Sequence, residues 1–540
     1  MENRNFHQTW FLTRFSLKRD WLKLALWSVT MVVLFAAVAA KFTTIYDTQA
    51  SIDEIVKTLK SPSMISLFGK LSGSAPYSTA DVFAGEMTVF MAMMAAIMNF
   101  SIIIKNTRGE EDSGLLEIIQ SHSVGKLSNL ASSLIELFII NLLIGLFYGI
   151  GLQMANLPGT DTNGNFLLGL GLGAAGFMFA AIAAFLAQLV DNSRSATILS
   201  YVVFGIMYIA RMSTDVSNPK ATWLIPFGWV EKFSTYQDNN WLPVFLMLGL
   251  SLILVVAALW INNHRDIGSG LVATRPGRSK AYMFLRGPLS LFWRLHRTSI
   301  IVWVIGLLIL GYTYGSIFNT IGDILKTNPA MESIFGAGAV HKANVLIIKN
   351  FISILMIVFG VLALFPGIQI INYLKTGESK GYLELIHSKP VSRNYLFTSV
   401  LVLGMTTSIA ALFAAIMGLQ LGGMSVMKHP VASSVFLNSF YAYISPTVLM
   451  LAIAACIIGW IPRLSVFGYL YAGFALFIGY FGKLIDLPKW MAKLTPFGFI
   501  TKVPVHKMDI STMWWQLGLA VILILIGYIG YHIRDLKSAN

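Results

Sequence analysis

The 540-residue sequence contains a single cysteine, Cys456, and charged residues make up only 12% of it. One cysteine excludes a disulfide bond within the chain. The sequence also lacks a GxxxxGKS or GxxxxGKT phosphate loop, an HExxH zinc motif and a GxSxG nucleophile motif, and its nine histidines have no partner at metal-ligand spacing. These absences exclude nucleotide binding through a phosphate loop and leave no catalytic or metal-binding constellation to assign.

Hydrophobic residues, in contrast, make up 56% of the chain, and the mean hydropathy is +0.69. These values indicate a polytopic membrane protein, because ordinary soluble domains are far more polar. A helix needs about 20 apolar residues to cross the hydrocarbon core. Runs of about this length occur at 22–40, 82–104, 131–154, 166–190, 196–211, 242–261, 299–315, 350–374, 396–421, 436–461, 465–481 and 513–532. The predicted fold is therefore all-α, with twelve transmembrane helices.

The formal net charge of +14 is spread along loops and span ends. This distribution argues against nucleic-acid binding, which favours one basic stripe, and favours contact with anionic lipid headgroups. Because cytoplasmic loops retain arginine and lysine, the charges also predict the orientation. With both termini in the cytoplasm, Arg211 is the only one of 15 arginines in an outer segment. We expect a multi-pass protein of the cell membrane with cytoplasmic N- and C-termini.

A polar stretch between the second and third apolar runs occurs twice. RGEEDSGLLEIIQS at 108–121 recurs as KTGESKGYLELIHS at 375–388, after an offset of 267 residues. In each copy an acidic, glycine-containing turn leads into about two turns of amphipathic helix. The apolar residues expected on one side of these helices are Leu115, Leu116 and Ile119 in the first copy and Tyr382, Leu383 and Ile386 in the second. The predicted orientation places both helices in the cytoplasm, where they must contact something outside the bilayer.

Other segments repeat at similar offsets. They are Pro62, Met64, Ser66, Phe68 and Gly69 with Pro329, Met331, Ser333, Phe335 and Gly336, LIPFGW at 224–229 with LTPFGF at 494–499, and Arg265–Asp266 with Arg534–Asp535. Their common order indicates a tandem duplication. Six runs per half is an even number, so the halves are expected to be parallel repeats. The predicted domains are a first six-span repeat at 1–265, a cytoplasmic linker at 266–283 and a second six-span repeat at 284–540.

Two further features concern the first half. Phe6, Trp10, Leu17 and Trp21 are spaced to lie on one helical face among basic residues, which predicts an amphipathic helix in the membrane surface before the first span. The alternative is an unstructured basic tail that only orients this span. Glu136 lies inside the third run, and intramembrane charges are often functional. Its alternative is a snorkelling or hydrogen-bonded side chain near the inner headgroups.

With the repeated stretch in the cytoplasm, the chain resembles the permease subunit of ATP-binding cassette exporters of the ABC-2 type. The twelve-span tandem form resembles the exporters of polyketide antibiotics, the tetronasin-resistance type. The resemblance implies that this chain is not itself an ATPase and holds no cofactor, and that two copies of a separate subunit, which bind ATP and Mg, dock beneath it. The coupling residues it implies are Glu110, Glu111, Gly114, Leu116 and Glu117, with Glu378, Gly381, Leu383 and Glu384. Gly377 replaces Glu110 in the second copy, which leaves the equivalence of the two docking sites open.

The resemblance also suggests that the Pro-Phe-Gly stretches form short re-entrant helices at the outer end of the pathway. These residues are Pro226, Phe227 and Gly228, with Pro496, Phe497 and Gly498. Aromatic anchoring at the outer interface is the alternative. For the two coupling helices, the alternative is packing beneath their own spans with Glu117 and Glu384 solvated. The cargo expected of this family is a hydrophobic or amphipathic compound, such as an antibiotic, another drug-like molecule or a lipid, exported from a prokaryotic cell.

Two other functions remain in competition. A proton-coupled secondary transporter would also have six plus six spans in parallel repeats, but with a basic loop after the second span and charged residues in mid-membrane. A membrane-embedded lipid-modifying enzyme would need paired carboxylates or clustered histidines at a membrane boundary. Here the loop is acidic and the spans are nearly uncharged, so we favour the permease.

Overall fold

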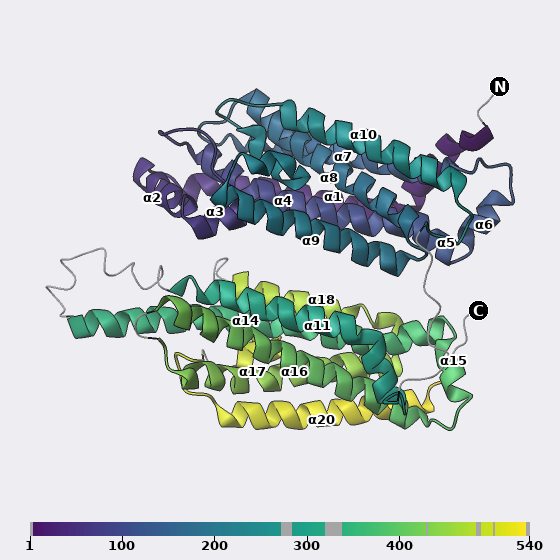
Figure 1. Cartoon of the computed structure of the whole chain (residues 1–540). Helices are drawn as coiled ribbons and strands as arrows, with labels where there is room; N and C mark the ends of the chain where they lie inside the picture. Colours follow the sequence, from purple (N-terminus) through teal and green to yellow (C-terminus); the bar gives the residue numbers. More distant parts are fainter. Residues whose placement is uncertain are drawn as a thin grey trace. The chain divides into compact units, whose positions relative to one another are not determined.

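All regular secondary structure in the described part of the computed structural model is helical (Figure 1). The described residues are 4–271, 283–318, 337–427, 430–481, 488–500 and 503–535. The chain divides into two compact units, unit 1 at Met1–Gly277 and unit 2 at Arg278–Asn540, each with its own hydrophobic core. Residues 272–282 of the predicted linker and the repeated segment from Pro329 to Gly336 lie outside the described residues.

Unit 1 combines long apolar helices with short elements at both ends. The long helices are α1 (Thr9–Ile45), α4 (Thr79–Ile104), α7 (Ser128–Ala155), α8 (Thr162–Leu189), α9 (Ser193–Ser217) and α10 (Leu242–His264). The short ones are η1 (Arg4–Phe6), α2 (Gln49–Leu59), α3 (Pro62–Phe68), the π-helical turn η2 (Lys105–Gly109), α5 (Glu110–Asp112), α6 (Leu115–Gln120), η3 (Ala221–Leu224) and η4 (Pro226–Phe233). In Figure 1, α2 and α3 lie at the end of unit 1 opposite α5 and α6.

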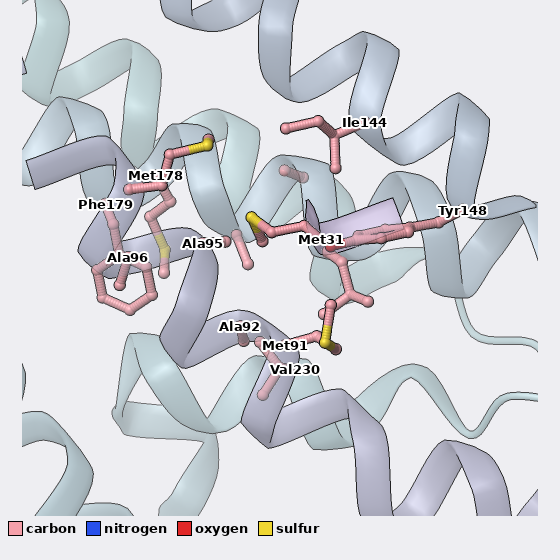
Figure 2. Close-up of a cluster of buried hydrophobic side chains, with 14 of the residues drawn as sticks. Met31, Met91, Ala92, Ala95, Ala96, Ile144, Tyr148, Met178, Phe179 and Val230 are labelled. Atoms are coloured by element: carbon pink, nitrogen blue, oxygen red, sulfur yellow. The ribbon is translucent and has the colours of Figure 1, made fainter. Parts of the chain in front are cut away.

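Helix α8 is the centre of unit 1, since its apolar window is the most buried of the spans of this unit. A Cβ atom on Gly169 would meet the backbone of Gly145, and one on Gly173 would meet the carbonyl oxygen of Asn141. The small residues therefore allow α7 and α8 to pack with their backbones in close approach. Figure 2 shows the adjoining core, in which Met31 and Tyr148 lie among alanine and methionine side chains.

Unit 2 contains a second set of long helices. They are α11 (Pro288–Gly315), α14 (Ala337–Ser379), α16 (Arg393–Val426), α17 (Ser433–Trp460) and α20 (Ile510–Ile533). The shorter elements are α15 (Tyr382–His387), η5 (Pro462–Leu464), α18 (Phe467–Leu476), the π-helical turn η6 (Phe477–Phe481), α19 (Lys489–Ala492) and η7 (Pro496–Phe499). Glycines bring α11 and α16 together, because a Cβ on Gly311 or Gly418 would meet a carbonyl oxygen of the opposite helix.

Eleven helices in the described residues are long and apolar enough to cross a membrane, six in unit 1 and five in unit 2. Twelve were predicted. The run at 465–481 forms α18 and η6, which together end at Phe481, before residues that lie outside the description. Its described part is therefore shorter than a full span.

The N-terminal segment differs from the prediction. Instead of a separate surface helix, α1 runs without a break from Thr9 to Ile45, over 37 residues. At 1.5 Å per residue it is about 55 Å long, whereas the hydrocarbon core is about 30 Å thick. The periodicity of the sequence could not distinguish a separate surface helix from one continuous helix, because the same helical stripe continues from the basic segment into the apolar run.

The first long helices of the two units bury the same stripe of positions. Each buried residue of this stripe on α1 has a buried counterpart 276 residues later on α11: Leu12 and Pro288, Ser16 and Phe292, Asp20 and His296, Leu24 and Ile300, Met31 and Leu307, Phe35 and Gly311, and Ala39 and Gly315. The buried register is shared, but the side chains differ. The polar contacts made by these two helices therefore differ as well.

Candidate functional site

The two predicted short helices are present and begin in the same way. Gly114, before α6, has φ of 74°, and Gly381, before α15, has φ of 70°. This left-handed conformation is strained for residues with a side chain, and no atom lies within 4 Å of a Cβ at either glycine. Backbone conformation, not lack of space, thus explains the glycine at both turns.

Each short helix has one buried side and one exposed side. Leu116 and Leu383 face inward and are 6% and 2% exposed. On the outer side Ile118 and Leu385 are 63% and 72% exposed. The other exposed residues of this surface are Leu115 and Glu117 on α6 and Tyr382 and Glu384 on α15. We call these six residues the exposed faces of α6 and α15.

This arrangement corrects the predicted grouping of apolar residues. Leu115 and Leu116 do not share a side, because Leu116 packs inside the chain while Leu115 is exposed. The same holds for Tyr382 and Leu383. Leu116 and Leu383 therefore hold the helices in place and are not available for contact with another subunit.

The carboxylate of Glu111 makes its polar contacts with residues of unit 1. It accepts hydrogen bonds from both terminal nitrogens of Arg265, at 2.6 and 2.8 Å, and from the backbone N–H of Gly268 at 2.6 Å. Arg108, which is fully buried, forms a second ion pair with it at 3.0 Å. Charge-assisted bidentate pairs of this kind are among the strongest hydrogen-bonded contacts in proteins. Glu111 is thus committed to internal contacts.

Unit 2 has the corresponding pair. Nη2 of Arg534 donates to the two carboxylate oxygens of Glu378 at 2.7 and 3.0 Å. Arg265 and Arg534 are the C-cap residues of α10 and α20, the last long helix of each unit. The repeated Arg-Asp dipeptide was visible in the sequence, but nothing in the sequence assigned its partner.

Glu110 also pairs with a residue of its own unit, and this pairing is specific to unit 1. Arg19 of α1 donates to it at 2.6 Å. In unit 2 the corresponding residue is Gly377, where an added Cβ would approach Leu383 Cγ to 3.0 Å. Among the residues assigned to coupling, the exposed carboxylates are therefore Glu117 and Glu384.

Glu136 lies fully buried in α7. Asn106 Nδ2 donates to its Oε2 at 3.2 Å and to Asp20 Oδ2 at 3.1 Å, so one amide bridges two carboxylates. Within the described residues, Glu136 Oε1 has no hydrogen-bond partner. Glu136 is therefore hydrogen-bonded inside unit 1, and its functional role stays a prediction.

Among the described residues of unit 2, the positions equivalent to Asp20 and Glu136 carry no carboxylates. His296, the counterpart of Asp20, packs edge-on against Tyr373 with ring centroids 5.0 Å apart. Tyr373 follows Asn106 by the repeat offset of 267 residues, and Leu403 follows Glu136 by the same offset. The two units therefore differ chemically at this buried position.

The first Pro-Phe-Gly stretch begins the 3₁₀ helix η4. Phe227 is fully buried, with its ring 5.7 Å from Phe179 and 5.3 Å from Phe204. A Cβ on Gly228 would lie 2.8 Å from the carbonyl oxygen of Thr222, so the preceding turn requires glycine here. Pro226 fixes the first position of the helix.

The second Pro-Phe-Gly stretch forms η7 with a similar contact. A Cβ on Gly498 would overlap the carbonyl oxygen of Ala492, six residues earlier, as Thr222 is six residues before Gly228. The Phe497 ring is buried 6.0 Å from that of Tyr443, and the carbonyl oxygen of Pro496 accepts from Gln516 at 2.8 Å. Both phenylalanines pack inside their own units. Aromatic anchoring at the outer interface, which was expected of the flanking tryptophans, stays a prediction.

Arg211 organises the segment around η4, a role that the sequence did not reveal. Its guanidinium, fully buried, pairs with Glu231 at 2.5 Å and Asp215 at 3.7 Å, and donates to the carbonyl oxygen of Ser66 at 2.7 Å. Two carboxylates share one cation. Burial, together with the charge of Asp215, raises the pKa of Glu231 to about 8, although Arg211 opposes this shift.

The cavities beside these clusters are small and partly open. A cavity of about 40 Å³ lies next to Glu231, and one of about 20 Å³ next to Glu111 and Arg265. Drug-sized ligands occupy pockets of about 300–1,000 Å³. Neither cavity can hold such a ligand. In the described residues, no group of three or more His, Cys, Asp or Glu side chains is placed to bind a metal ion.

Comparison with known proteins gives two consistent results. The family model described as "Multidrug efflux system permease Rv1217c, C-terminal domain" matches the chain twice, at residues 14–261 and 285–532. The multidrug efflux system permease protein Rv1217c of Mycobacterium tuberculosis (strain ATCC 25618 / H37Rv) is 28% identical over 541 residues, covering 98% of this chain and 96% of the relative. The two family matches together cover most of the sequence. The chain therefore belongs to the family of the multidrug efflux system permease Rv1217c, C-terminal domain.

Proposed function

We propose that this chain is the membrane-spanning permease subunit of an ATP-driven exporter of the ABC-2 type. It moves a hydrophobic or amphipathic compound out of the cell, while a separate subunit hydrolyses ATP. Family membership and the name of the relative, a multidrug efflux permease, support the transport role. The eleven candidate spans support its place in the membrane.

The observation that carries the ATP-driven part is the pair of exposed faces on α6 and α15. Each presents two large apolar side chains and one carboxylate, on a helix whose inner side is fixed by a buried leucine. Such a face suits a groove with an apolar floor and a basic rim on a soluble partner. Because each unit has one such helix, we propose that two ATP-binding subunits dock, one on each.

The remaining assignments follow from this proposal. The double match of the family model supports two parallel repeats, and the resemblance to exporters of polyketide antibiotics suggests a substrate of that chemical type. Docking from the cytoplasm requires α6 and α15 to lie on the cytoplasmic side of the membrane. This agrees with the arginine distribution, which favours both termini in the cytoplasm. The family resemblance suggests the membrane of a prokaryotic cell.

A proton-coupled transporter is the second candidate, and the buried carboxylates Asp20 and Glu136 are what favour it. Both lie in unit 1, however, and their bridge through Asn106 has no carboxylate counterpart at His296 and Leu403. We therefore favour the permease that requires ATP.

The test is to purify the chain alone and with its co-encoded ATP-binding subunit. We expect ATPase activity only in the complex, and native mass spectrometry should detect two ATP-binding subunits per chain. A complex with one or four such subunits, or failure to form any complex, would contradict the proposal.

A further inference from the structure

We propose that Arg265 and Arg534 are positioning residues that clamp the coupling helices α6 and α15 to the last long helix of their own unit. This inference rests on the proposed function, because it assigns the route by which movement of a docked subunit reaches the membrane spans. We call the Glu111–Arg265 and Glu378–Arg534 ion pairs the clamps.

Each clamp acts at the turn from which the short helix emerges. The carbonyl oxygen of Glu111 accepts the N–H of Gly114 at 3.1 Å, and that of Glu378 accepts the N–H of Gly381 at 3.0 Å. The backbone of each glutamate therefore closes the left-handed turn, while its side chain binds the arginine. Any displacement of the arginine is transmitted directly to the start of the helix.

Each clamp also joins distant parts of its unit. Glu111 and Arg265 are 154 residues apart, and Glu378 and Arg534 are 156 residues apart. Some polar contacts nearby are not shared, since Arg19 binds Glu110, which Gly377 replaces in unit 2, and His296 replaces Asp20. Another contact is shared, because Lys126 donates to the carbonyl oxygen of Asn263 and its repeat equivalent Arg393 donates to that of His532. The clamp thus persists where part of its surroundings differs.

The side chains of both clamps are largely buried, which restricts each ion pair to one geometry. The side chains of Arg265 and Glu111 are 6% and 3% exposed, and those of Arg534 and Glu378 are 18% and 8% exposed. Removing one partner of a buried pair leaves the other charge unpaired, which is costly. The unit 1 clamp has additional support from Arg108 and the Gly268 N–H, whereas in the described part of unit 2 the ion-pair partner of Glu378 is Arg534.

The full-length protein with Cys456→Ser provides the test. A spin label is attached to a single cysteine at Leu385 on α15, and in a second protein at Ile118 on α6. In the permease alone, Arg534→Gln should increase label mobility at 385 and leave the label at 118 unchanged. The charge exchange Glu378→Arg with Arg534→Glu should restore the original mobility at 385. Arg534→Lys keeps the charge but replaces the guanidinium by a single ammonium nitrogen on a differently shaped side chain, so its effect should be intermediate. This variant is used if Arg534→Gln does not fold.

The coupling role is measured in the complex. Arg534→Gln should preserve subunit binding and ATP hydrolysis but reduce the transport per ATP hydrolysed by about tenfold or more, and the charge exchange should recover it. Unchanged mobility at 385 would overturn the clamp. Increased mobility with normal transport per ATP would overturn its coupling role. If the wild-type chain binds no ATP-binding subunit, the proposed function fails instead, and the mobility measurement still decides whether the clamp exists.

Discussion

Arg19 donates a 2.6 Å hydrogen bond to Glu110 and so ties the first long helix of unit 1 to the segment that leads into α6. The same guanidinium contacts Asp20 at 3.0 Å, and Asp20 in turn accepts from Lys105 at 3.1 Å. Because Gly377 stands at the equivalent of Glu110, this tie is limited to unit 1. We expect α6 to be held more firmly than α15.

Glu110→Gln should destabilise the protein, because the Arg19–Glu110 ion pair loses its negative charge at a site where Glu110 is 9% exposed, while the amide oxygen can still accept from Arg19. The expected loss is about 1 kcal/mol, the difference between a hydrogen bond to a charged group and one to a neutral group. Thermal or denaturant unfolding in detergent measures it. Glu117→Gln is the matched control on an exposed position and should change stability by no more than about 0.5 kcal/mol. Equal effects of the two variants would contradict the assignment.

The exposed faces of α6 and α15 should determine docking. The double variant Glu117→Gln, Glu384→Gln should bind the ATP-binding subunit more weakly, by about 2–5 kcal/mol if the carboxylates are desolvated in the complex and by about 0–1 kcal/mol if they remain at its rim. Ile118→Ser with Leu385→Ser should weaken binding further through lost apolar burial.

Titration of the purified permease with its ATP-binding subunit measures these losses. Leu224→Ser, at another highly exposed leucine (84%), is the control and should bind normally. If both double variants bound the subunit and transported like the wild type, α6 and α15 would not be the docking helices.

The Arg211–Glu231–Asp215 cluster should make stability depend on pH. The carboxyl of Glu231 ionises near its ordinary value of 4.5 in the unfolded chain but near 8 in the folded protein. Protonation of Glu231 therefore makes its full contribution to the stability of the folded protein below pH 4.5, and this contribution is lost as the pH rises to about 8. Melting curves between these pH values should show the wild type losing stability relative to Glu231→Gln. Parallel curves for the two proteins would contradict this prediction.

The orientation can be tested with single cysteines on a Cys456→Ser background. Phe227 and Phe497 are buried, so exposed neighbours are better sites. An impermeant thiol reagent added outside intact cells should label cysteine at Leu224 or Leu494, and should label cysteine at Ile118 only after the membrane is opened. Labelling in the reverse pattern would invert the topology.

The sequence predicted the elements near the candidate site better than their contacts. The short helices and their glycine turns could be located because Gly114 and Gly381 occur at one repeat offset and precede helical periodicity. The pairing of Glu111 with Arg265 could not be predicted, since periodicity within a stretch gives no distance to a residue 154 positions away. The sequence also could not predict that Leu116 is buried and Leu115 exposed, because both are leucine and the helix covers only six residues.

Hydropathy also could not predict where the long helices begin and end. Apolar runs mark the part of a helix that suits lipid, whereas α1 begins at Thr9 and continues through a basic segment whose polar residues contact η2 and α5. Arg211 was noticed only as an exception to the charge distribution. Its burial against Glu231 gives a physical reason for that exception, because a paired, buried arginine is not a free loop charge.

Transport driven by ATP is the central claim, and reconstitution tests it most directly. Proteoliposomes are prepared with the permease alone or with its co-encoded ATP-binding subunit, and accumulation of a panel of hydrophobic fluorescent dyes is followed with Mg–ATP outside or with an imposed proton gradient. We predict accumulation only when both proteins and Mg–ATP are present, with no effect of dissipating the proton gradient. Accumulation by the permease alone, driven by the proton gradient without ATP, would contradict the account.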